Sequence, residues 1–144
     1  MKTKLLSILL IVVMCLLSFA ACGEDDSLTK ITVNVKVTAD GRDIIDDVFS
    51  IEYDPNDDYV PTVLDAVIKA CEECEFKYTL WSNGNSFESI SGDTIDTYAN
   101  NDTMWWRWTL NGVEPEEGTA NDHAIKNNDV IVFSYEEQNF EIEE

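Results

Sequence analysis

Two cysteines separated by two residues form the first group of side chains that could do chemistry. Cys71-Glu72-Glu73-Cys74 has the spacing of a dithiol redox motif. Redox thiols of this kind lie at a helix N-terminus near positive charge, whereas these lie where a predicted helix ends, with two carboxylates between them that raise a thiol pKa. We therefore expect a local structural disulfide between Cys71 and Cys74, with free buried thiols as the alternative and dithiol redox work as a weaker third interpretation.

Metal-binding and hydrolytic arrangements are poorly represented. His123 is the only histidine and there is no second cysteine pair of zinc-finger spacing, so the sequence predicts no zinc site. Asp54, Asn56 and Asp58 alternate as in the first half of a calcium loop, but the following Gly and the later Glu are missing, which favours a solvated acidic turn. No serine lies in a nucleophile elbow. A pair of carboxylates is the one catalytic arrangement left open, and a binding protein is favoured over an enzyme.

Aromatic side chains are concentrated in one stretch, which reads Met-Trp-Trp-Arg-Trp-Thr-Leu-Asn-Gly from Met104 to Gly112 and holds three of the four Trp residues of the chain. In an extended strand, successive side chains point to opposite faces, so Trp106 and Trp108 share one face and Trp105 and Arg107 share the other. A sheet with one buried face needs large apolar groups on that side only. The second face therefore has an indole available for binding.

The segments before this stretch predict strands and one helix. Apolar and polar residues alternate from Lys30 to Thr38 and, more weakly, from Ile44 to Tyr53, which predicts a hairpin. The helix begins after Thr62, where Asp65 completes a capping box, and ends near Cys74. Alternation then resumes from Phe76 to Trp81.

The remaining segments are less regular. Residues 86–91 predict a short strand, 92–102 a polar loop pinned by Tyr98, and 114–118 an acidic connection. The nearly continuous apolar run from Val130 to Tyr135 predicts a strand buried on both faces. The order of elements favours an α+β class, with one helix packed on a mixed β-sheet in a β-grasp-like roll.

The first residues predict where the protein is located in the cell. Lys2 and Lys4 precede an apolar run, and Ala20-Ala21-Cys22 follows it, so residues 1–21 predict a secretory signal peptide. The same ending resembles a bacterial lipobox, in which Cys22 is acylated and becomes the mature N-terminus. We therefore expect a lipid-anchored, extracytoplasmic protein on the cell membrane or outer membrane, and a plain secreted protein is the alternative.

Charge limits the partners of the mature chain. Removing Lys2 and Lys4 with the leader leaves seven of the nine basic residues against all 29 acidic ones, a formal charge of −22. Nucleic acid is thereby excluded as a natural partner, and membrane contact is expected through the lipid anchor only. We divide the chain into the leader, an acidic tether at 22–29, a domain at 30–137 and an acidic tail at 138–144.

Three phrases in order resemble a known family. They are Thr62–Ala66 at the start of the helix, Trp106–Gly112 in the Trp-rich strand, and Asn128–Tyr135 at the last strand. Together they are similar to the C-terminal domain of transcobalamin and intrinsic factor, and to bacterial relatives of largely unknown function. Asn128 departs from the family, which usually carries Gly there, although Asn also tolerates a left-handed backbone. The printed sequence also lacks the helical domain that shares the ligand in the vitamin carriers.

The resemblance implies capture of cobalamin or another corrinoid without catalysis and without a resident cofactor. A flat, largely apolar macrocycle would suit exposed indoles surrounded by polar side chains. The candidate ligand-binding residues are therefore Trp105 and Arg107 first, then Trp81, Tyr98 and Asn111.

Two alternatives stay open. Trp105 could simply cover a long loop, because aromatic stripes are usually packing. A structural or adhesive surface module that binds a protein or glycan partner through the same aromatic face is the rival function.

Overall fold

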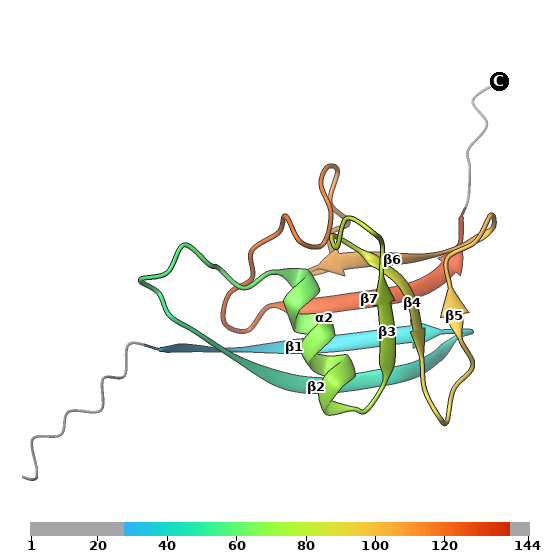
Figure 1. Ribbon diagram of the computed structural model, residues 1–144, viewed down its shortest axis with the longest axis horizontal. Helices are drawn as coiled ribbons and strands as arrows, with labels where there is room; N and C mark the ends of the chain where they lie inside the picture. The colour runs from blue at the N-terminus through green and yellow to red at the C-terminus, as the bar shows by residue number, and fades with distance from the viewer. Residues whose placement is uncertain (1–27, 139–144) are drawn as a thin grey trace, which may run out of the picture.

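The computed structural model describes residues 28–138, so the leader, the lipidation residue Cys22, most of the tether and the tail from 139 lie outside the described residues. Strands dominate the described part of the chain, and its single helix packs against them (Figure 1). This helix, α2 (Val63–Glu73), is only 11 residues long. Within the described residues, no helix has the length and apolar character needed to span a bilayer.

The larger sheet has four strands in the order β2-β1-β7-β6. β1 (Thr29–Ala39) and β2 (Arg42–Tyr53) form the expected hairpin, and β6 (Met104–Leu110) pairs antiparallel with β7 (Val130–Glu137). The central pair, β1 and β7, is parallel, so the sheet is mixed. The alternation read from β1 holds, since Ile31, Val33, Val35 and Val37 are all buried.

The helix begins as its capping residues predict. The side chain of Thr62 accepts a hydrogen bond from the Asp65 backbone N–H at 3.4 Å, and the Asp65 carboxylate accepts one from the Thr62 N–H at 2.8 Å. This reciprocal pair satisfies two of the donors that a helix N-terminus leaves unpaired. The helix then buries one apolar stripe, formed by Val63, Leu64, Ala66, Val67, Ala70 and Cys71.

A smaller sheet of three strands lies beside the helix on the same face of the larger sheet (Figure 1). Its strands are β3 (Lys77–Leu80), β4 (Phe87–Ser91) and β5 (Tyr98–Ala99), all antiparallel. Phe87 of β4 meets Phe133 of β7 edge to face at a centroid distance of 5.6 Å, which joins the two sheets across the core. The arrangement is α+β, with a helix and a small sheet covering one face of a mixed sheet.

One local expectation was wrong. β7 is not buried on both faces, because Ile131 and Phe133 are buried while Val130 is exposed, and the larger sheet keeps one face toward solvent. The segment that follows the acidic connection at 114–118 returns to the helix. The backbone N–H groups of Val63 and Leu64 donate to the carbonyls of His123 and Ala120, so this segment covers the helix N-terminus.

Candidate functional site

Two indoles that are distant in sequence meet at the free edge of the larger sheet. The rings of Trp81 and Trp105 are stacked, with centroids 6.2 Å apart and an interplanar angle of 21°. Both remain accessible, at 39% for Trp81 and 36% for Trp105. An exposed pair of parallel aromatic rings is an apolar platform of the kind that binds flat or methylated groups.

Local structure positions each ring. Trp105 lies on β6, the edge strand of the larger sheet, directly across from Glu136 on β7. Trp81 follows β3, and its backbone is held in a turn because its N–H donates to Ser86 and its carbonyl accepts from Gly84. Gly84 has a φ of 71°, a conformation that a residue without Cβ adopts without strain. The pair therefore joins one element from each sheet.

A hollow of about 380 Å³ adjoins the pair. Asp102 and Gln138 line its rim, together with the amide side chains of Asn100 and Asn101. These two amides are already used: Asn100 accepts from the Trp106 N–H at 2.8 Å, and Asn101 accepts from the Met104 N–H at 3.0 Å. They shape the rim, so ligand contact is left to the indoles, Asp102 and Gln138.

Arg107 borders an adjoining hollow of about 310 Å³ that Trp105 also lines. Its guanidinium makes a bidentate ion pair with Glu114, with Nη2 2.6 and 2.7 Å from the two carboxylate oxygens. The hydrogen bonds and charge of Glu114 raise the pKa of Arg107 further above its ordinary value, and Glu136 adds to the effect. The expected ligand-contacting arginine is thus present beside Trp105, but its charge is balanced within the protein.

Tyr98 does not belong to this surface. The structure places it in the core at 4% exposure, where its backbone carbonyl accepts from the indole N–H of Trp106 at 3.0 Å. Its hydroxyl accepts from Arg42 at 3.2 Å. Tyr98 on β5 therefore fastens the small sheet to the large one, and its expected role in ligand contact is corrected to a structural one.

Asn111 is also a structural residue. It turns the chain after β6 with a φ of 54°, and its side-chain amide donates to the buried carboxylate of Asp129 at 3.0 Å. Its side-chain oxygen accepts from the Val130 N–H at 2.9 Å. Two of the phrases that carry the family resemblance therefore meet here, where they lock the β6 turn to the start of β7, and no donor or acceptor of Asn111 is aimed at the Trp pair.

The other two tryptophans support the core, as their phase in the strand predicts. Trp106 is 7% exposed, and Trp108 is half-buried against Phe133 and under the ring of His123, whose centroid lies 5.0 Å away. His123 in turn bonds the carbonyl of Glu117 at 2.9 Å. This histidine thus covers Trp108.

The two thiols of the Cys71–Cys74 pair are not joined in the structure. The structure therefore does not form the expected disulfide between Cys71 and Cys74. Cys71 lies on the core-facing stripe of α2, whereas Cys74 is the exposed C-cap, so the two thiols occupy different environments. Burial, followed by the charges of Cys74 and Glu72, raises the pKa of Cys71 to about 12. A thiol held protonated in this way is a poor nucleophile.

The acidic loop after β2 is closed on itself, because Asp54 accepts from the backbone and side chain of Asn56 at 2.8 and 2.9 Å. Across residues 28–138, no group of three or more His, Cys, Asp or Glu side chains is arranged to hold a metal ion.

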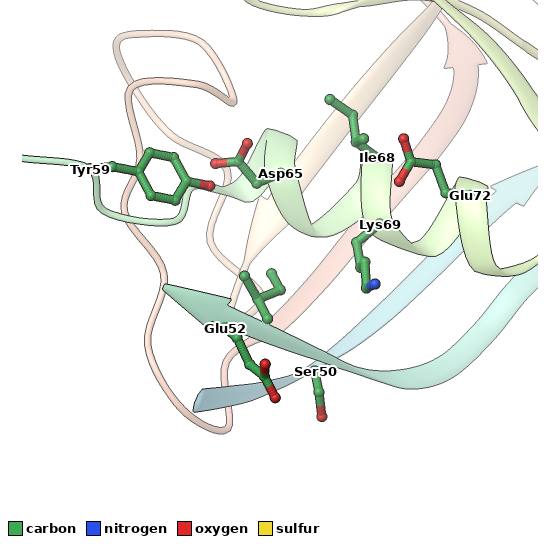
Figure 2. Close-up of a pocket in the computed structure, with 8 residues that line it drawn as sticks. Ser50, Glu52, Tyr59, Asp65, Ile68, Lys69 and Glu72 are labelled. Atoms are coloured by element: carbon green, nitrogen blue, oxygen red, sulfur yellow. The ribbon is translucent and has the colours of Figure 1, made fainter. Parts of the chain in front are cut away.

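A second recess, of about 480 Å³, lies elsewhere, between α2 and β2 (Figure 2). Lys69 is paired there with Glu73 at 3.0 Å, and Asp65 is engaged in the helix cap. Tyr59 points its hydroxyl toward Asp65, and burial together with that carboxylate raises the pKa of Tyr59 to about 12. Half of the residues that line this recess are charged, so it offers a ligand less apolar surface than the Trp pair does.

Comparisons with known proteins do not identify a function for this site. No protein-family model and no curated protein matches the sequence. Among solved structures, a "putative metal binding protein" from Ruminococcus gnavus ATCC 29149 is similar at a TM-score of 0.48 and 16% identity, covering 76% of this chain and 99% of its own. At that level of similarity it carries no argument about this chain.

Proposed function

We propose that the chain is a cell-envelope lipoprotein whose domain binds a ligand without catalysis, and that the Trp81–Trp105 pair is its binding site. The observation that carries the proposal is the exposure of two stacked indoles above a hollow, at a position where neither is needed to cover the core. Exposed large aromatics that gather from separate elements mark binding sites more often than isolated ones do.

We assign the fold to the β-grasp type and the chain to the transcobalamin C-terminal-like group. Support comes from the strand order β2-β1-β7-β6 with a parallel central pair and one helix crossing the sheet. The contact between Asn111 and Asp129 gives two of the family phrases a common structural purpose.

The first candidate ligand is cobalamin or another corrinoid. A flat macrocycle could lie on the indoles, and its amide edges could donate to Asp102 or bond Gln138 at the rim. Since the hollow is open, one face of such a ligand would remain in solvent.

The proposed location in the cell envelope follows from the predicted signal peptide at residues 1–21. Acylation of Cys22 would anchor the domain, and the formal charge of −22 would keep its body away from an anionic bilayer. A domain held outside the membrane in this way is suited to capture.

The rival is an adhesive module that binds a protein or glycan partner through the same face. The acidic side chains around the pair favour a basic partner for such a module, whose association rate should then fall steeply with salt. Corrinoid binding through apolar contacts should survive high salt.

Calorimetric titration with cyanocobalamin and with cobinamide tests the proposal. The protein is the mature chain, residues 22–144, with Cys22→Ser to prevent lipidation. We expect saturable heat that is lost in Trp105→Ala and retained in Tyr59→Ala, a matched exposed aromatic from the other recess. Absence of binding to both corrinoids removes this ligand class, and equal binding by the two variants removes the site.

A further inference from the structure

The charges around the Trp pair are predominantly negative. Asp102 lines the hollow beside both indoles, and Glu136 lies directly across the β6–β7 ladder from Trp105. Opposed residues in an antiparallel pair have Cβ atoms about 5 Å apart, so the side chains of Glu136 and Trp105 leave the sheet next to each other. Both carboxylates are solvent-exposed.

The nearest positive charge does not offset them. Arg107 is held by both oxygens of Glu114 in a bidentate pair. The four ionised groups next to the pair, Asp102, Glu114, Glu136 and Arg107, therefore sum to two negative charges. An anionic ligand would be repelled and would have to displace Glu114 to reach the guanidinium.

Hydrogen-bond donors are also scarce at the rim. The amide nitrogen of Asn100 donates to the carbonyl of Phe87 at 3.0 Å, and that of Asn101 donates to the carbonyl of Ala99 at 3.2 Å. A ligand that needs donors, such as a carboxylate or phosphate, therefore finds few of them beside the indoles. Besides the indole N–H groups and the Gln138 amide, the site offers aromatic faces and carboxylate acceptors.

We infer that the Trp81–Trp105 site selects cationic ligands and accepts a methylated ammonium group against its indoles. This inference rests on the proposed function, because it names the ligand chemistry of the same site. An ammonium group within about 6 Å of an indole centroid is attracted by the negative face of the ring. Because the two indoles are stacked, each covers one face of the other, so an ammonium group in the hollow contacts the outer face of one ring.

Methylation matters because it removes the N–H groups that make an ordinary ammonium prefer water, while it keeps the positive charge. A trimethylammonium group gives methyl contacts to the indoles and needs no hydrogen-bond acceptor. Asp102 and Glu136 then act through charge alone.

The matched probes are choline and its uncharged isostere, 3,3-dimethylbutan-1-ol, titrated into the mature chain carrying Cys22→Ser and followed by Trp fluorescence and by NMR of the indole N–H signals. We expect choline to bind about threefold more tightly than the alcohol, from one exposed cation–π contact. Trp81→Ala and Trp105→Ala should each abolish this preference. Asp102→Asn should weaken choline about twofold without affecting the alcohol.

Tyr59→Ala is the control variant, and it should bind both probes as the parent chain does. Equal affinities for choline and the alcohol, or no choline binding, would overturn the inference. Either result leaves the proposed function to be decided by the corrinoid titration, which probes the indoles with a different ligand. If corrinoids fail and choline binds, capture at the Trp pair stands with a cationic ligand in their place.

Discussion

The buried carboxylate of Asp129 should contribute more to stability than any other acidic side chain whose bonds are described above. Asp129 is 4% exposed and accepts from the Asn111 side chain at 3.0 Å and from the Lys126 N–H at 2.9 Å, one bond to each oxygen. In Asp129→Asn one oxygen becomes an NH2 group, which cannot accept from either donor. The variant therefore loses one bond to a charged group and keeps the other only in a neutral, weaker form.

The expected cost can be worked from these two bonds. A hydrogen bond to a charged group contributes about 1.5–3 kcal/mol, and a neutral one about 1 kcal/mol. Asp129→Asn should therefore lower the free energy of unfolding by about 3 kcal/mol. Asn111→Ala should cost much less in that background than in the parent chain, since the two side chains share one bond.

Urea unfolding followed by Trp fluorescence measures both values on the mature chain with Cys22→Ser. Asp58→Asn is the matched control, because it removes the same charge from the exposed acidic loop and should change stability by less than about 0.5 kcal/mol. If Asp129→Asn and Asp58→Asn unfold at the same urea concentration with equal slopes, the account of Asn111 and Asp129 as a structural lock is refuted.

Four further predictions use the same chain. Thr62→Ala removes the helix cap and should cost about 1 kcal/mol in urea unfolding, and an unchanged midpoint would contradict the capping box. Trp106→Ala should cost about 3–5 kcal/mol, whereas Trp105→Ala should cost less than about 1 kcal/mol, because only the first ring is buried. Iodoacetamide at pH 8 should modify Cys74 and spare Cys71, as mass spectrometry of the peptides would report. Since folding raises the pKa of Cys71 from 9.0 to about 12, the thiol contributes stability that is complete below pH 9 and is lost as pH rises toward 12; Cys71→Ala should lose less stability over that interval than the parent chain does.

The sequence predicted those helices and strands whose buried face is visible in the spacing of neighbouring apolar residues. The alternation in β1, the capping residues of α2 and the phase of Trp105 against Trp106 all depend on the nearest few residues, and each agrees with the structure. The α+β class follows from those elements in order.

The polar residues near the site were harder to interpret, because their partners lie far away in sequence. Asn111 was predicted to contact a ligand, but its amide donates to Asp129, which lies 18 residues later in the sequence. Tyr98 sat in a polar loop, and only the packing of the small sheet against β6 buries it. Side chains of this kind serve structure or ligand equally well, so composition alone does not separate the two roles.

The meeting of Trp81 and Trp105 depends on how the two sheets are placed relative to each other. Each residue could be proposed for binding from its own segment, but their stacking requires the turn after β3 to reach the edge strand β6. The position of Glu136 across from Trp105 likewise follows from the β6–β7 register, which a single sequence does not fix.

The central claim, that the Trp pair binds the ligand, is tested most directly by ¹⁹F NMR of the chain labelled with 5-fluorotryptophan. The four Trp residues give one signal each, so the buried Trp106 serves as an internal control. On addition of cyanocobalamin, cobinamide or choline, we predict saturable shifts in the signals of Trp81 and Trp105, with that of Trp106 nearly unchanged. Binding detected by calorimetry with no movement of the Trp81 and Trp105 signals would contradict the account.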